Sequence, residues 1–257
     1  MALMSCNFFS SVLGYDTDVK VILPEAKWQF PLDENEKLEY KVLYLLHGMG
    51  DNSSGWGRYT SIERYALEKN IAIVMPTAGH SFYSDSVHGK KYFTFIAEEL
   101  PILMKRWFPI SKKPEDTFIA GVSMGGYGAL KIGFTYPEKF AGMASLSGAV
   151  IINKLIENAF EESRKDITKI MEDVFGTTEP EGMDELLFLA KKNIAPMEKK
   201  PKILQYIGKE DFLYNMNMKF KEEIIKLNIP LIYDEWHGEH EWGFWDKAIK
   251  KAIDIFV

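Results

Sequence analysis

The sequence predicts an α/β fold, with a mostly parallel central sheet and helices on both faces. Several strand-length runs are continuously apolar, as strands covered on both faces should be. They alternate with segments whose apolar residues recur at helical spacing, and regular alternation of the two is typical of a parallel sheet. The chain has 257 residues, of which 46% are hydrophobic. It can therefore bury a large core, and we expect a single domain over residues 1–257.

The N-terminal half contains the first expected elements. Polar and apolar residues alternate over 16–23, which predicts an antiparallel strand with one solvent-exposed face. Pro24 ends this strand. Apolar runs predict buried strands at 42–46, 71–75 and 117–120, with helices over 59–69 and 94–107 between them.

The C-terminal half continues the alternation after one interruption. A helix over 127–132 is terminated by Pro137, and a strand follows over 140–146. The stretch from about 150 to 200 is richer in charge, and we interpret it as a short helical insertion at the place where a cap is expected. The remaining elements are a strand at 202–208, a helix over 218–227, a strand at 231–236 and a helix from about 241.

The segment Gly-Val-Ser-Met-Gly at 121–125 lies between a predicted buried strand and a predicted helix. This layout is that of a nucleophile elbow, in which a sharp turn projects a serine hydroxyl from the sheet edge. Glycine and serine are common turn residues, so the pattern alone is weak. Its position between strand and helix makes Ser123 the candidate nucleophile.

A serine hydroxyl needs a histidine to accept its proton and an acid to orient that histidine. Asp211 follows the strand at 202–208, and His240 follows the last predicted strand, so the order along the chain is Ser, Asp, His. Alternatives remain within the sequence. Glu210 competes as the acid, His237 as the base, and an aspartate after a strand is also a common helix cap.

The chemistry also needs backbone amides aimed at the developing oxyanion. We expect one from Met124, the residue after the serine, and one from Met49 in His-Gly-Met-Gly at 47–50. The alternative interpretation of the segment at 47–50 is an ordinary glycine turn. Aromatic residues near these loops are candidates for the substrate pocket, with core packing as their alternative role. The candidate pocket residues are Gly48, Trp56, Phe82 and Tyr83.

Composition and sequence pattern argue against several classes of protein. The 31 basic and 37 acidic residues are mixed along the chain, which argues against nucleic-acid binding. No apolar run is long enough for a transmembrane helix, and the first residues lack the features of a secretory signal. Cys6 is the only cysteine, which fits a reducing, cytoplasmic location. His237 and His240 lack a third nearby ligand, so no metal is expected.

Several segments together resemble one family, the esterase D and S-formylglutathione hydrolase group of α/β-hydrolases, and within it most closely the bacterial tributyrin esterases. The resemblance covers nearly the whole chain. Its motifs are Val-Leu-Tyr-Leu-Leu-His-Gly-Met at 42–49, Ala-Glu-Glu-Leu-Pro at 97–101, Phe-Ile-Ala-Gly-Val-Ser-Met-Gly-Gly-Tyr-Gly at 118–128, Gly-Lys-Glu-Asp-Phe-Leu-Tyr at 208–214 and His-Glu-Trp at 240–242.

This resemblance implies an α/β-hydrolase that cleaves short-chain acyl esters, acetyl to butyryl, with Ser123, His240 and Asp211 as its triad and no cofactor. The partner implied is a small-molecule ester substrate. Related members include carbohydrate deacetylases and feruloyl esterases, which are the main alternative. The stretch at 48–51 lacks the cysteine usual in S-formylglutathione hydrolases, which disfavours thioester specificity. A non-catalytic binding protein with the same fold and a homo-oligomer also stay open.

Overall fold

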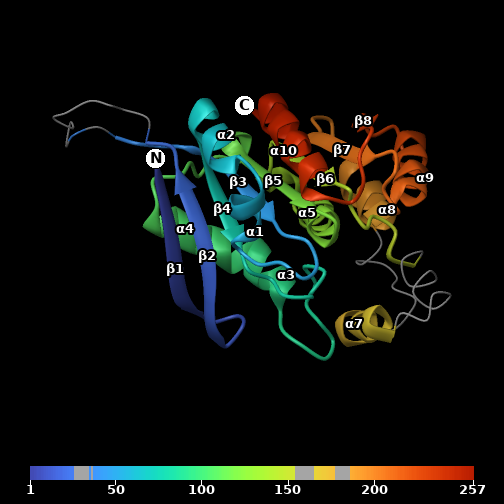
Figure 1. Cartoon of the computed structure of the whole chain (residues 1–257), viewed down its shortest axis with the longest axis horizontal. Coiled ribbons are helices and arrows are strands. Elements are labelled where there is room, and N and C mark those ends of the chain that lie inside the picture. The colour runs from blue at the N-terminus through green and yellow to red at the C-terminus, as the bar shows by residue number, and fades with distance from the viewer. Residues whose placement is uncertain (26–34, 36, 154–164, 177–185) are drawn as a thin grey trace.

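The computed structural model describes residues 1–25, 35, 37–153, 165–176 and 186–257. These residues form an eight-stranded sheet in the order β1-β2-β4-β3-β5-β6-β7-β8 (Figure 1). The strands are β1 (Ala2–Ser10), β2 (Tyr15–Leu23), β3 (Lys41–Leu46), β4 (Ile71–Pro76), β5 (Thr117–Val122), β6 (Gly142–Leu146), β7 (Lys202–Gly208) and β8 (Ile232–Trp236). From β4 to β8 all neighbours are parallel, while β1 and β2 pair antiparallel at one edge. The predicted mostly parallel sheet is confirmed.

Helices cover both faces of the sheet (Figure 1). In chain order the helical elements are α1 (Gly55–Tyr59), α2 (Ile62–Lys69), α3 (Tyr92–Thr94), the π-helical turn η1 (Phe95–Glu99), α4 (Leu100–Trp107), η2 (Pro114–Asp116), α5 (Met124–Thr135), η3 (Pro137–Lys139), α7 (Lys165–Phe175), α8 (Leu186–Leu189), η5 (Ala190–Ile194), α9 (Tyr214–Lys226) and α10 (Trp242–Phe256). Apolar residues of α2 and α10 form the core on one face, and those of α4, α5 and α9 belong to the larger core on the other.

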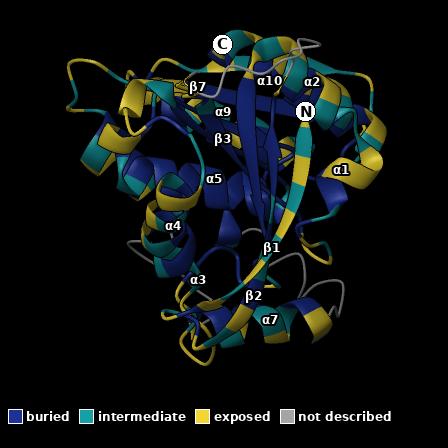
Figure 2. Ribbon diagram, turned by 90° about the vertical axis from the view of Figure 1, so that its left-hand side faces the viewer, coloured by how far each residue is buried: buried dark blue, intermediate teal, exposed yellow. Residues whose placement is uncertain are grey.

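The middle of the sheet is buried on both faces, as Figure 2 shows by its dark strands. Every residue of β5 is buried. Because side chains alternate across a strand, Ile119 enters the larger core while Phe118 and Ala120 enter the other. A continuous apolar run is therefore what a central strand needs, and this is why the sequence predicted these strands correctly.

The edge strand β1 was missing from the prediction. It pairs with β2 over its whole length, from Ala2 opposite Leu23 to Ser10 opposite Tyr15. Its exposure alternates, but Leu3 and Phe9 lie on the exposed side. Apolar residues on both faces obscure the period-two pattern on which the prediction of a strand depends.

Three of the predicted helices also differ in extent from the prediction. The helix expected over 59–69 is broken, because Thr60 has an extended backbone and its Oγ1 accepts the Ile62 N–H at the start of α2. The helix expected from 218 begins at Tyr214. The helix expected over 94–107 starts two residues earlier and passes through the π-helical turn.

The predicted insertion is helical where it is described, while residues 154–164 and 177–185 lie outside the described residues. Its helix α7 is attached to the loop between β4 and α3. There the Val87 N–H donates to the Val174 carbonyl (3.0 Å), and the His88 N–H donates to the Asp173 carbonyl (3.1 Å). A cap over the active site stays a prediction. Among the helices of the described chain, none has the length and apolarity needed to cross a membrane.

The turn from β5 into α5 brings backbone directly against backbone. A Cβ added to Gly121 would lie 2.2 Å from the Gly125 carbonyl oxygen, and one added to Gly125 would lie 2.6 Å from the carbonyl oxygens of Leu46 and His47. Only glycine fits at both positions. The loop after β3 is thereby pressed against the first turn of α5.

We predict that Gly121→Ala lowers the free energy of unfolding by about 1–3 kcal/mol, because the added methyl meets backbone atoms that no rotamer change can move. Urea unfolding measures the change. Gly57→Ala is the matched control, since a Cβ there meets nothing within 4 Å. That control should leave stability unchanged or slightly raised. A Gly121→Ala protein as stable as the wild type would contradict the prediction.

Candidate active site

Ser123 lies at the carboxyl end of β5, between that strand and α5. Its backbone has φ 54° and ψ −116°, in a region that residues other than glycine rarely adopt. Main-chain hydrogen bonds hold it there. Its N–H donates to the Leu146 carbonyl (2.9 Å), and its carbonyl accepts from the N–H groups of Tyr127 (3.1 Å) and Ala149 (3.2 Å).

His240 joins Ser123 to Asp211 in one hydrogen-bonded chain. Its Nε2 is 3.0 Å from the Ser123 Oγ, and its Nδ1 is 2.9 Å and 3.1 Å from the two Asp211 carboxylate oxygens. A carboxylate can only accept, so Nδ1 carries the proton and Nε2 is left to accept from the serine hydroxyl. Three residues separated by up to 117 positions are thus brought together in the order needed for proton transfer.

The Asp211 carboxylate is fully buried, while the His240 side chain keeps 19% of its surface exposed. Oδ1 of Asp211 also accepts the Leu213 N–H at 2.8 Å. A buried charge is tolerated when it is paired and hydrogen-bonded, and both conditions hold here. The arrangement fixes the aspartate and leaves the histidine open to a reactant.

Two aromatic residues that the sequence did not single out flank the imidazole of His240. The ring of Phe212 lies 4.6 Å away and is 72% exposed, while Trp245 meets the imidazole edge-on at 4.9 Å. Trp245 is oriented in turn by a 3.0 Å hydrogen bond from its Nε1–H to the Ser147 Oγ. No spacing along the chain signals these contacts, because they arise from the path of the loop before α10, which places His240 between the two rings.

Glu210 and His237, the alternatives left open by the sequence, pair with each other. The His237 Nδ1 is 2.8 Å from the Glu210 Oε1, and the His237 side chain is 91% exposed. The Gly238 N–H, and after it His237, lower the pKa of the Glu210 carboxyl. The described residues contain no group of three or more metal-ligating side chains. His237 and His240 thus face different carboxylates.

The loop after β3 passes beside Ser123. A Cβ added to Gly48 would lie 3.6 Å from the Ser123 Cβ, and Met49 follows with 37% of its surface exposed. On the other side Met124 begins α5, so no carbonyl of that helix can accept its N–H. Of the two candidate amide donors, Met49 therefore follows a residue that lies beside Ser123, and Met124 follows Ser123 itself.

Three aromatic residues named as pocket candidates are fully buried. The Tyr83 hydroxyl donates to the His47 carbonyl (2.9 Å) and the Trp56 Nε1–H donates to the Leu46 carbonyl (3.0 Å), so both support the loop after β3. Burial raises the pKa of Tyr83, which keeps its hydroxyl a donor. Phe82 and Tyr83 both have positive φ, 47° and 50°, an unusual conformation for bulky residues. A role in a substrate pocket stays a prediction.

His47 is held as a neutral imidazole. Its Nε2 accepts the Ala78 N–H (2.9 Å), so its Nδ1 carries the proton that is donated to the Gly48 carbonyl (2.7 Å). Burial is the main cause that lowers its pKa. A second proton on Nε2 would face the Ala78 N–H, donor against donor.

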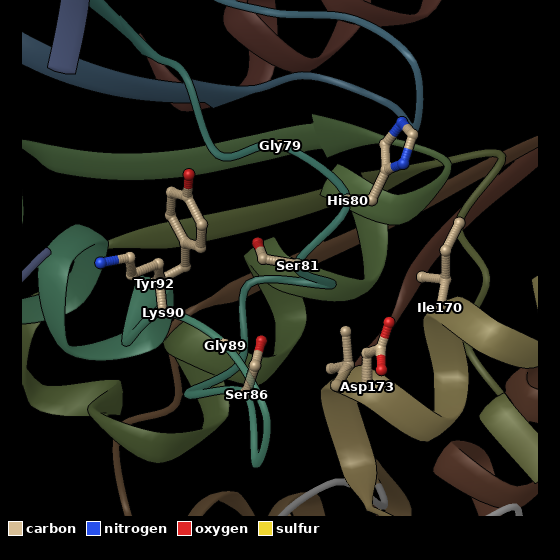
Figure 3. Close-up of a pocket in the computed structure, with 10 residues that line it drawn as sticks. Gly79, His80, Ser81, Ser86, Gly89, Lys90, Tyr92, Ile170 and Asp173 are labelled. Carbon is tan, nitrogen blue, oxygen red and sulfur yellow. The ribbon is translucent and has the colours of Figure 1, made fainter.

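A cavity of about 330 Å³ lies between α7 and the loop from β4 to α3 (Figure 3). Six of its ten lining residues have polar side chains, and Ile170 and Val174 of α7 form its apolar side. The polar side chains that line it are His80, Ser81, Ser86, Lys90, Tyr92 and Asp173. Because β3, β4 and β5 are parallel, this loop leaves the same edge of the sheet as Ser123.

Comparison with known proteins places these features among ester hydrolases. The model of the family described as putative esterase matches residues 10–254. An acetyl esterase of Caldicellulosiruptor saccharolyticus is 33% identical over 267 aligned residues, covering 99% of this chain and 97% of that protein.

Two solved structures from Staphylococcus aureus are similar over nearly their whole length. The substrate-bound fluorophosphonate-binding serine hydrolase F is 35% identical with a TM-score of 0.88, covering 99% of this chain and 98% of its own. The apoenzyme of an S-formylglutathione hydrolase is 36% identical with a TM-score of 0.84 and the same coverage. The architecture is thus the α/β-hydrolase fold.

We predict that His47 makes stability depend on pH. Its pKa is lower in the folded chain than the unfolded value of about 6.5, so the unfolded state binds more protons between these values. Stability from His47 is therefore present above about pH 6.5 and is lost as the pH falls towards its folded pKa. Urea unfolding of wild type and His47→Asn should show a difference that shrinks between pH 7.5 and 5.5, by at most about 1.4 kcal/mol per pH unit.

The exposed His88 provides the control, because His88→Asn leaves His47 and its two backbone partners in place and should keep the loss of stability that His47 causes at low pH. A difference between wild type and His47→Asn that is independent of pH would show that His47 is not held neutral.

Proposed function

We propose that this chain, which belongs to the putative esterase family and is a carboxylic ester hydrolase, cleaves short-chain acyl esters with Ser123 as nucleophile, His240 as base and Asp211 as orienting acid. The observation that carries the proposal is the hydrogen-bonded chain from the Ser123 Oγ through His240 to Asp211. Its order of donors and acceptors is the one that serine acylation requires.

In the proposed first half-reaction the Ser123 oxygen attacks the ester carbonyl while its proton moves to the His240 Nε2. The carbonyl electron pair becomes an oxyanion. Collapse of the tetrahedral intermediate expels the alcohol, which takes the proton from His240 and leaves the acyl group on Ser123. Asp211 keeps the Nδ1 proton in place and stabilises the imidazolium.

In the second half-reaction water gives its proton to His240 and attacks the acyl-enzyme. The carboxylic acid leaves and Ser123 regains its proton. We assign the oxyanion to the N–H groups of Met124 and Met49. Met124 follows Ser123 at a helix N-terminus, and Met49 follows Gly48, which lies beside Ser123. Loss of one such donor typically lowers turnover by about 100- to 1,000-fold.

The acyl range that we propose is acetyl to butyryl. It is supported by the acetyl esterase relative, whose 33% identity extends over 99% of this chain. A thioester substrate is less favoured, even though one similar structure is an S-formylglutathione hydrolase. The stretch Gly-Met-Gly-Asp at 48–51 lacks a cysteine beside the proposed oxyanion loop.

We predict that Ser123→Ala abolishes labelling by a fluorophosphonate and lowers kcat on p-nitrophenyl acetate by at least about 10⁴-fold. Asp211→Asn should lower kcat by about 10⁴-fold, because the wrong histidine tautomer is then favoured. Glu210→Gln should cost less than about tenfold, since Glu210 does not contact His240. Wild-type turnover in Ser123→Ala, or a greater loss in Glu210→Gln than in Asp211→Asn, would reject these assignments.

A second candidate is a carbohydrate acetyl esterase, and the polar cavity beside α7 favours it. The Ser81 and Ser86 hydroxyls and the His80 imidazole on one wall, with the Asp173 carboxylate on the other, suit the hydroxyls of a sugar better than an acyl chain (Figure 3). The sugar would be the alcohol part of the ester, with its acetyl group at Ser123. Feruloyl esters lack this support, because Ile170 and Val174 on the apolar side of the cavity offer no aromatic ring to stack on a feruloyl group.

We predict that a substrate panel separates the two candidates. With p-nitrophenyl acetate, butyrate and octanoate, kcat/KM should fall sharply beyond butyrate. With acetylated xylo-oligosaccharides, Asp173→Ala should lower kcat/KM by about tenfold more than it does with p-nitrophenyl acetate, the equivalent of one hydrogen bond to a charged group.

Glu172→Ala is the matched control, because Glu172 neighbours Asp173 on α7 but does not line the cavity. Equal effects of Asp173→Ala on the sugar ester and the simple ester would rule out a sugar in this cavity. Release of acetate measures turnover of the sugar esters.

A further inference from the structure

The segment that carries His240 is held by the turn that carries Asp211. The Lys209 N–H donates to the Trp236 carbonyl (3.0 Å), and the Glu210 N–H donates to the Gly238 carbonyl (3.2 Å). These bonds continue the pairing of β7 with β8 beyond the ends of both strands. The segments that carry the two proposed catalytic side chains are therefore joined by backbone hydrogen bonds at residues 209 and 210.

The Glu210 side chain adds a second attachment to the same segment. Its Oε2 accepts the Gly238 N–H at 2.7 Å, and its Oε1 is 2.8 Å from the His237 Nδ1. Residue 210 thus both donates to residue 238 and accepts from it. The carboxylate is in turn held by His237, which has no contact with Ser123 or Asp211 among the described interactions.

Little space remains for this segment to move. A Cβ added to Gly208 would lie 2.0 Å from the Gly238 carbonyl oxygen, and one added to Gly238 would lie 2.6 Å from the Phe244 ring. The chain at 238 is therefore enclosed between the turn at 208–211 and α10. His240 follows two residues later, so the position of residue 238 constrains where the His240 imidazole lies relative to Asp211.

We propose that Glu210 is a positioning residue, which acts through Gly238 to keep the His240 imidazole in register with Asp211, with His237 holding the Glu210 carboxylate in place. This inference rests on the proposed function, because it assigns His240 and Asp211 to proton transfer. Glu210 itself touches neither the serine nor the substrate. Its ion pair with His237 is largely exposed and contributes little to global stability, so its effect is local.

The test compares kcat, KM and the melting temperature of four variants on p-nitrophenyl acetate. Glu210→Ala removes both side-chain bonds, and kcat should fall by about tenfold while KM changes by less than about twofold. Glu210→Gln keeps an acceptor for the Gly238 N–H and should recover most of this loss. His237→Ala should cost about two- to threefold.

Glu239→Ala is the matched control, because it removes a glutamate from the same exposed segment and should leave kcat unchanged. Melting temperatures of all variants should lie within about 3 °C of the wild type. Equal kcat in Glu210→Ala and Glu239→Ala, a loss carried by KM, or no recovery in Glu210→Gln would overturn the proposal. If Glu210→Ala does not fold, an unchanged kcat in His237→Ala overturns it instead.

Proton NMR separates this inference from the proposed function. The proton between the His240 Nδ1 and Asp211 should give a far-downfield resonance in the wild type, in Glu210→Gln and in Glu239→Ala, and a broadened or absent one in Glu210→Ala. An unaltered resonance in Glu210→Ala overturns the inference. This readout does not depend on turnover, so it tests positioning even if no ester is cleaved, which would be a failure of the proposed function alone.

Discussion

The close approach of backbone to backbone at the start of α5 is the constraint on which the site depends. Gly121 and Gly125 leave no room for side chains between β5, α5 and the loop after β3. Ser123 is held between them in an unfavourable backbone conformation, which the surrounding main-chain hydrogen bonds maintain. The same contact brings Gly48 beside the serine, so one packing solution positions both the hydroxyl and the neighbouring amides.

His240 needs a different kind of support, because it lies in a loop. Its ring is bonded to Ser123 and Asp211, and Phe212 and Trp245 flank it. The bonds set which nitrogen carries the proton, while the rings limit rotation of the imidazole. These contacts fix the orientation of a side chain that the loop backbone alone would leave less precisely placed.

Strain and support are distributed over the loops around the serine as well. Phe82 and Tyr83 have positive φ angles, and the Tyr83 hydroxyl donates a hydrogen bond to the His47 carbonyl. His47 itself bridges to the loop after β4 through Ala78. The loops after β3 and β4 therefore form one connected unit, and the loop after β4 also lines the cavity beside α7.

The sequence alone determined the order of the central strands along the chain and indicated Ser123 as the candidate nucleophile, because buried strands need continuous apolar runs and a sharp strand-to-helix turn needs glycine. It also proposed Asp211 and His240 from chain order, yet left Glu210 and His237 as rivals. Only the tertiary structure decided which carboxylate meets which imidazole, since residues one and three positions apart in loops are distinguished by the path of the backbone and not by their spacing. The contacts of Trp245 and the bond from the Gly238 N–H to Glu210 were missed for the same reason, because they join segments far apart in the chain, which local periodicity does not encode. The edge strand β1 was missed for a local reason, since apolar residues on both of its faces obscure the period-two pattern.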